Sequence, residues 1–188
     1  MNDSSNKSMA SLLKYIILYL VSMLAEGIYR LQYLNDHFIS DYINIIKLSS
    51  NINMIISTLF AVFYILIILL ICYLIIELFN LKVSINSVIQ GFILIVLTYT
   101  FFQYIKLIVD LIFLKLPDNI LIDNDDSFLN LLKRSTWYQY ITIIDYLMIL
   151  VGVIVFGMEM FKQENKQNIF DIFILSYVFV ICNIILLL

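Results

Sequence analysis

Ionisable side chains are scarce inside the long apolar stretches of this chain. These few residues are the candidates for binding or catalysis. Asp145 lies ten residues after Ser135 and thirteen before Met158, near the middle of an apolar run. An ionised Asp at the centre of a membrane helix costs about 2.5–3.5 kcal/mol on insertion scales, so it should face a bundle interior or water. We expect Asp145 either to bind a proton, an ion or a partner protein, or to be a hydrogen-bonded structural residue.

Lys106 and Asp110 are four residues apart near the end of another apolar run. This spacing permits an ion pair on a helix, although Lys before Asp is the weaker order, worth only a few tenths of a kcal/mol. We therefore predict a solvated face at the membrane boundary, with an ion pair as the alternative. Gly91, earlier in the same region, is the position where a neighbouring backbone could approach closely.

The residues show no catalytic or metal-binding pattern. His37 is the only histidine, which excludes Ser-His-Asp and Cys-His catalysis as well as a multi-His metal site. Glu26 and Arg30 match half of the Glu-Glu-x-x-x-Arg pattern of intramembrane CAAX-type proteases, but the second Glu is missing and no later helix carries His. Cys72 and Cys182 lie in apolar runs, as free packing thiols do. We expect no enzymatic activity, no metal and no cofactor.

Hydropathy predicts the elements that must position these residues. Residues 52–76 are 25 residues without a formal charge, and a helix needs about 20 apolar residues to cross about 30 Å of hydrocarbon. After a disordered tail at residues 1–8, we expect further spans at 10–30, 83–105, 135–158 and 167–188. The first span is expected to be an uncleaved helix rather than a signal peptide, with a helix lying in the interface as its alternative. The prediction is one all-α domain, a polytopic integral membrane bundle of about five transmembrane helices.

Residues 28–50 have a different pattern. Apolar side chains recur there at spacings of three and four, at Leu31, Leu34, Phe38, Tyr42 and Ile45, with polar side chains on the opposite side. This periodicity is typical of an amphipathic helix that lies on a membrane or against a bundle. We therefore expect a separate amphipathic interfacial helix after the first span.

The composition also favours a lipid environment. The chain is 63% hydrophobic and 13% charged, with a mean hydropathy of +0.99, whereas soluble domains are about half apolar and a quarter charged. The formal net charge is −3 without a basic run, so nucleic acid is not an expected partner. The expected partner is the lipid bilayer. Five basic residues fall on one side of the predicted topology and six on the other, so the positive-inside rule does not decide the orientation.

Three features of the layout go together: five spans, a tight hairpin between the second and third, and a polar loop between the third and fourth. Thr136 to Leu188 adds aromatic residues and an Asp at the start of the fourth span, a Gly late in it, and a short polar turn before the last span. In these features the chain resembles the Yip family of five-helix membrane proteins.

The Yip family is implicated in membrane trafficking in eukaryotes, and similar bacterial proteins accompany MacB-like ABC exporters that protect against toxic peptides. The resemblance implies a non-enzymatic accessory or scaffold protein of a bacterial cytoplasmic membrane. Its partners would be an ABC permease and ATPase, or a second copy of itself. Asp145, Lys106, Asp110 and Gly91 are the candidate binding or partner-contact residues. The alternative is a small transport or substrate-binding subunit that uses the buried polar groups.

Overall fold

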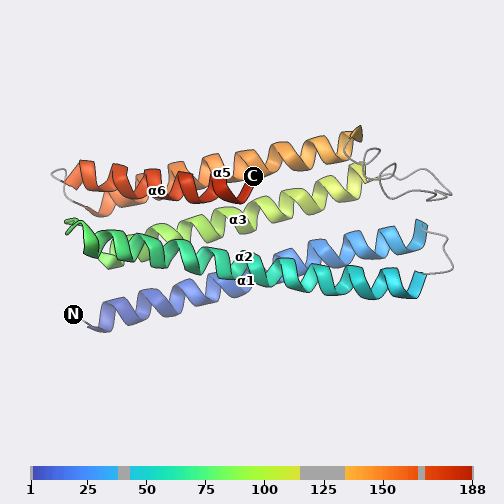
Figure 1. Ribbon diagram of the computed structural model, residues 1–188, viewed down its shortest axis with the longest axis horizontal. Helices are drawn as coiled ribbons and strands as arrows, with labels where there is room; N and C mark the ends of the chain where they lie inside the picture. Colours follow the sequence, from blue (N-terminus) through green and yellow to red (C-terminus); the bar gives the residue numbers. More distant parts are fainter. Residues whose placement is uncertain (1, 38–42, 115–133, 165–167, 188) are drawn as a thin grey trace.

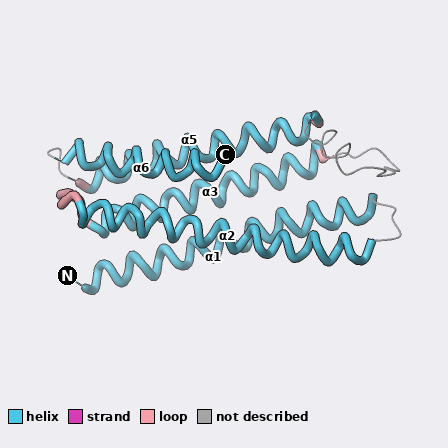
Figure 2. Tube along the Cα trace, in the orientation of Figure 1, coloured by secondary structure: helices cyan, strands magenta, loops and turns pink. Residues whose placement is uncertain are grey.

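The computed structural model describes residues 2–37, 43–114, 134–164 and 168–187. These residues form five helices and, within the described ranges, no strand: α1 (Asn2–His37), α2 (Ile43–Leu78), α3 (Ile85–Phe113), α5 (Thr136–Gln163) and α6 (Ile169–Leu187). Figure 2 shows helix along almost all of the described chain, and the longest described loop is the one between α2 and α3. The prediction of an all-α bundle is confirmed.

The helices lie side by side along one long axis and alternate in direction (Figure 1). α3 is the central helix, because it packs against α1 and against α5 more extensively than any other two helices pack. α2 lies mainly against α1, and α6 lies against α5 and α2. The chain is thus a bundle in which α1 and α5 flank α3.

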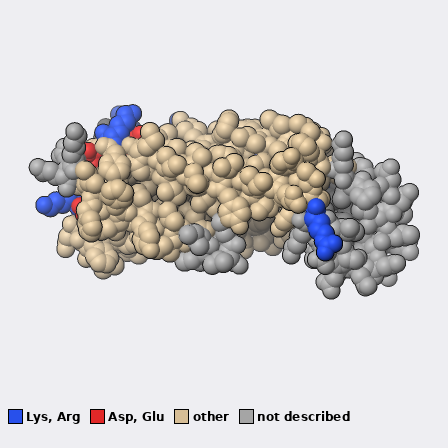
Figure 3. Space-filling model, turned by 90° about the horizontal axis from the view of Figure 1, so that it is seen from above, with Lys and Arg blue, Asp and Glu red and all other residues tan. Residues whose placement is uncertain are grey.

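The outer surface of the bundle is apolar between its two ends. Large hydrophobic side chains are exposed on all five helices, among them Ile17, Phe60, Leu111, Leu150 and Phe170. In the face drawn in Figure 3, the Lys, Arg, Asp and Glu side chains gather at the two ends. Such a belt needs lipid rather than water as its solvent, and helices satisfy their own backbone hydrogen bonds there. The protein is therefore an integral, multi-pass membrane protein.

Four helices are long and apolar enough to cross the membrane: Lys7–Tyr33, Asn51–Leu78, Ile85–Phe113 and Thr136–Gln163. The first predicted span is thus a helix of crossing length, and it packs along α3. The segment predicted as a fifth span is also an apolar helix, but its described apolar part, Ile169–Asn183, is shorter than the other four.

Two predictions for the first fifty residues are wrong. Residues 2–8 are not a disordered tail, because α1 begins at Asn2, and the buried Ser8 hydroxyl donates to Asn86 Oδ1 at 2.7 Å. No separate amphipathic helix follows the first span, because α1 continues to His37 and α2 begins at Ile43. The periodicity of residues 28–50 therefore belongs to the ends of two long helices, while residues 38–42 lie outside the described ranges.

Local side chains mark the predicted hairpin between α2 and α3. α2 ends in a Schellman motif, in which Asn80 has φ 48° and the Leu81 N–H donates to the Ile76 carbonyl. Asn tolerates this left-handed conformation better than most residues. The Ser84 hydroxyl then caps α3 by accepting the Ser87 N–H. The chain reverses within a few residues, as predicted.

Gly91 lies in the contact between α3 and α5. It is buried, and a Cβ at this position would lie 2.6 Å from Cδ2 of Phe156, so the neighbour that approaches it closely is an aromatic side chain of α5 rather than a backbone. Gly152 of α5 is the reciprocal position, where a Cβ would lie 2.9 Å from Cε1 of Tyr99 on α3. Two glycines therefore allow large aromatic rings of the opposite helix to fill the α3–α5 interface.

Candidate charged site inside the bundle

Five ionisable side chains from three helices form what we call the charged network. They are Glu26 and Arg30 of α1, Lys106 and Asp110 of α3, and Asp145 of α5. All five lie within the helical segments that are apolar enough to cross a membrane. Charges at such positions are costly, so their pairing is the first thing to establish.

Asp110 is the enclosed centre of one half of the network. Its side chain has no exposed surface, its Oδ2 accepts from Arg30 Nε at 2.7 Å, and its Oδ1 accepts from Trp137 Nε1 at 2.7 Å. The Arg30 guanidinium also pairs with Glu26 and lies over the Trp137 ring, 5.2 Å from its centroid. Both carboxylate oxygens of Asp110 are used, so Asp110 is enclosed and ties α1, α3 and α5 together, while 27% of the Arg30 side-chain surface is exposed.

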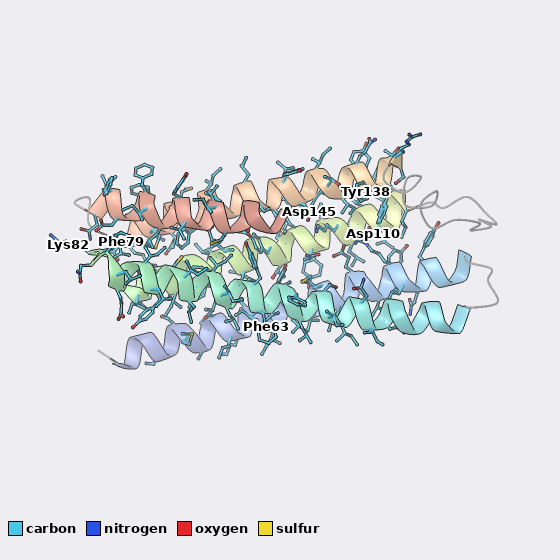
Figure 4. The ribbon with its side chains drawn as sticks, in the orientation of Figure 1. Phe63, Phe79, Lys82, Asp110, Tyr138 and Asp145 are labelled. Carbon is cyan, nitrogen blue, oxygen red and sulfur yellow. The ribbon has the colours of Figure 1, made fainter. Side chains whose placement is uncertain are left out.

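Lys106 and Asp145 form the other half, which is open. The Lys106 ammonium is largely buried and pairs with Asp145 Oδ1, whereas 32% of the Asp145 side-chain surface is exposed. Figure 4 places Asp145 and Asp110 on the neighbouring helices α5 and α3, away from the end of the bundle that carries Phe79 and Lys82. Of the two aspartates, Asp110 and Asp145, only Asp145 is accessible.

The predictions for Lys106 and Asp110 are wrong in their surroundings and in their partner. Neither side chain belongs to a solvated face, and the two do not pair with each other. Each instead pairs with a charge on another helix, Asp110 with Arg30 and Lys106 with Asp145. A buried charge without such a partner is strongly destabilising. Asp145 does turn toward another helix of the bundle, as expected. Its function stays a prediction.

Glu26, Arg30 and Trp137 belong to the site, although the sequence analysis does not predict them there. Glu26 and Arg30 match only half of a protease pattern, and Trp137 is one of the aromatic residues at the start of the fourth span. A usable signal was present, because Glu26 and Arg30 are opposite charges at i, i+4 within an otherwise apolar stretch. Such residues inside a membrane segment usually pair with charges on other helices.

A cavity of about 1030 Å³ opens beside Asp145. Residues from all five helices line it: Tyr19, Asn53, Ile56, Ser57, Phe60, Ala61, Phe63, Tyr64, Ile65, Ile67, Tyr99, Asp145, Met148, Ile149 and Asn183. The Tyr64 hydroxyl donates to the Cys182 carbonyl, and the Tyr99 hydroxyl donates to Asn183 Oδ1 at 3.0 Å. The wall is therefore mainly apolar and aromatic, with Asp145 as its charged residue.

A second polar cluster lies at the opposite end of the bundle. Glu164, which follows α5, accepts from the Ser84 N–H at 2.9 Å, from the Ser87 hydroxyl at 2.6 Å and from Asn168 Nδ2 at 3.3 Å. Partial burial raises the pKa of the Glu164 carboxyl, but the hydrogen bonds from Ser87, Ser84 and Asn168 outweigh it, so the pKa lies below its usual value. This cluster fastens the end of α5 to the start of α3.

Metal chemistry finds no support among the described residues, where no three His, Cys, Asp or Glu side chains are grouped to hold an ion. Cys72 and Cys182 are both free thiols, as predicted. No family model, curated protein or solved structure matches the chain. The resemblance to the Yip family therefore stays a prediction, and function has to be argued from the charged network and the cavity.

Proposed function

We propose that this chain is a non-enzymatic membrane protein that binds a small molecule inside the bundle, as a transport or substrate-binding subunit. The observation that carries the proposal is the position of Asp145, which belongs to the charged network and also lines the cavity. Ionisable residues within membrane segments commonly mark substrate or ion pathways. At about 1030 Å³, the cavity is at the upper end of the range for sites that hold drug-sized ligands, roughly 300–1,000 Å³.

The contrast between the two aspartates supports this proposal over a purely structural network. A charge that only holds helices together is best enclosed, as Asp110 is, with both oxygens satisfied and no exposed surface. Asp145 keeps about a third of its side-chain surface open, at 32%. An incompletely covered charge in an apolar wall is costly unless a ligand or water completes it.

The cavity wall favours binding over catalysis. Its hydroxyl groups are engaged: Ser57 donates to the Met54 carbonyl of its own helix, Tyr64 and Tyr99 donate to α6, and Tyr19 is hydrogen-bonded to Gln103 of α3. A nucleophile needs a base within hydrogen-bond reach, and none of these hydroxyls donates to one. The wall offers shape, aromatic surface and one carboxylate, which are the features of a binding site.

An accessory role beside a larger exporter is a second proposal, which rests on the resemblance of Thr136 to Leu188 to the Yip family. The exposed aromatic side chains Phe60 and Phe63 of α2 favour it, since another membrane subunit could cover them as well as lipid does. Affinity purification from native membranes should then recover an ABC permease and ATPase with this chain. Recovery of the chain without any other membrane subunit contradicts that role.

Three probes of similar shape and different charge test small-molecule binding: tetraphenylphosphonium, tetraphenylborate and neutral triphenylphosphine oxide. A ligand that binds only the folded state stabilises it by about 2.7 kcal/mol at a hundred times its Kd. We expect at least one probe to raise the Tm of the protein purified in an uncharged detergent. Ala61→Phe fills the cavity and should abolish this rise.

Ala10→Phe is the matched control, because Ala10 is exposed and lies outside the cavity. It should leave the rise in Tm unchanged. If no probe stabilises the parent protein, or if Ala61→Phe and Ala10→Phe respond alike, the proposed binding function is wrong.

A further inference from the structure

We infer that the cavity beside Asp145 takes a lipophilic monocation, such as a hydrophobic ammonium or phosphonium compound. This inference rests on the proposed binding function and adds the charge class of the ligand. It follows from the charge balance of the network, from which of its acids is accessible, and from the rest of the cavity wall.

The charged network holds three carboxylates and two basic groups. With all five ionised, it carries one negative charge in excess. Arg30 is shared between Glu26 and Asp110, and Lys106 is committed to Asp145, so no basic group of the network is left over. An uncompensated charge inside a bundle is strongly destabilising. One added positive charge would balance the network.

Asp145 is the acid of the charged network at which a ligand can approach the excess negative charge. Glu26 and Asp110 are 6% and 0% exposed and do not line the cavity, whereas Asp145 does. Glu26 interacts electrostatically with Asp145 as well as with Arg30, Lys106 and Asp110. A cation bound against Asp145 therefore meets the charge of the whole network, not of one isolated pair.

The rest of the wall accepts a cation and does not favour an anion. Its aromatic rings can attract a cation, since positive charge is stabilised over an aromatic face; they belong to Tyr19, Phe60, Phe63, Tyr64 and Tyr99. The hydroxyls of Tyr64 and Tyr99 are already donated to α6. An anion would thus lack these donors, and so would the phosphate of a zwitterionic lipid. The ligand class is a free organic cation with a large apolar part.

A proton is the competing monocation, because it can neutralise the same excess charge. The titratable or charged groups that share the charged network or the cavity wall with Asp145 come from three other helices: Tyr19, Glu26 and Arg30 of α1, Tyr64 of α2, and Tyr99, Lys106 and Asp110 of α3. A proton bound by one of the three carboxylates would remove the excess charge, so acidification should weaken cation binding.

Equilibrium dialysis of the full chain in an uncharged detergent tests the inference. We expect tetraphenylphosphonium to bind at least about tenfold more tightly than tetraphenylborate, and Asp145→Asn to weaken it by about 10- to 100-fold, as for loss of a hydrogen bond to a charged group. Glu26→Gln removes the excess charge without altering the cavity wall, so it should also weaken binding. Glu159→Gln, an acid on α5 outside the cavity, should not.

Each other result is decisive. The proposed cation class is wrong if the phosphonium and the borate bind equally, or if Asp145→Asn binds the phosphonium with full affinity. In either case the proposed binding function still stands if Ala61→Phe abolishes binding. Absence of binding by all three probes overturns both. The comparison of the two ions uses the unmodified protein, so it remains decisive if Asp145→Asn does not fold. The affinity for the phosphonium should decrease as the pH is lowered. An affinity that stays constant on acidification contradicts the role of the excess charge.

Discussion

Two glycines set how closely α3 and α5 approach. Gly91 gives room to the Phe156 ring, and Gly152 gives room to the Tyr99 ring, with hypothetical Cβ distances below 3.0 Å in both cases. In membranes, helices associate through close packing rather than through a hydrophobic driving force, so small residues at the interface matter more than in water. The same two helices hold Lys106 and Asp145, whose pairing depends on this approach.

We predict that Gly91→Ala destabilises the bundle, because the added methyl overlaps a buried aromatic ring, with a cost of about 1–3 kcal/mol. Gly157→Ala is the matched control on α5, where the nearest atom to a Cβ is Ser176 Oγ at an ordinary 3.6 Å. There Ala should be neutral or stabilising by up to about 1 kcal/mol, since Gly is a poor helix former. Thermal unfolding of both variants in detergent measures the difference. Equal stability of the two would show that Phe156 yields without cost.

At the scale of elements, two turns at one end of the bundle hold each other. The turn between α2 and α3 presents backbone N–H groups, which donate to carboxylates near the α5–α6 connection: Lys82 N to Asp171 at 2.9 Å and Ser84 N to Glu164 at 2.9 Å. Asn168 Nδ2 completes the contact by donating to the Lys82 carbonyl. Backbone N–H and C=O groups near helix ends lack partners within their own helix, and here the neighbouring turn supplies the hydrogen bonds.

The low pKa of Glu164 gives this contact a pH dependence. A carboxyl whose pKa is lower in the folded than in the unfolded state contributes stability that is present above the unfolded value, 4.5 for Glu, and is lost as pH falls through the folded value. Thermal stability should therefore fall in this acidic range, and Glu164→Gln should remove part of the fall. Glu159→Gln serves as control. The same acid profile in Glu164→Gln and in the parent would show that Glu164 does not contribute.

At the scale of the whole molecule, the alternating helices place their described ends on two opposite faces. The turn at Lys82 and the end of α5 near Lys162 lie at one end of the bundle, and the start of α5 near Arg134 lies at the other (Figures 1 and 4). Between these ends the surface is mainly apolar, and the charged network is largely buried, although Arg30 and Asp145 keep 27% and 32% of their side-chain surface exposed. On the face drawn in Figure 3, the charged side chains lie at the two ends.

This arrangement predicts the sidedness of single-cysteine variants, made after Cys72 and Cys182 are replaced by Ser. In intact cells, an impermeant thiol reagent should label either both Lys82→Cys and Lys162→Cys or neither of them. Arg134→Cys should be labelled only if those two are not. Permeabilised cells should label all three. Different labelling of Lys82→Cys and Lys162→Cys in intact cells would contradict the crossing of α3 and α5.

Much of this architecture follows from the sequence alone. Long runs without charge determine that residues 52–76 and 83–105 are membrane helices, because hydrocarbon penalises any segment that cannot satisfy its own backbone. A costly charge in such a run predicts that Asp145 turns inward. Serines before residues 85 and 136 cap the helices within two residues of the predicted starts.

The tertiary structure decided what periodicity and spacing do not contain. Helical periodicity across residues 28–50 cannot tell one short helix from the ends of two long ones, since both bury one face. Spacing along α3 suggested Asp110 as the partner of Lys106, yet Asp110 binds Arg30 and Lys106 binds Asp145. Charges act through space, and the large cost of burying them is repaid by whichever opposite charge the packing brings within reach. That packing depends on Gly91 and Gly152 admitting rings from opposite helices, a relation that no local stretch of sequence contains.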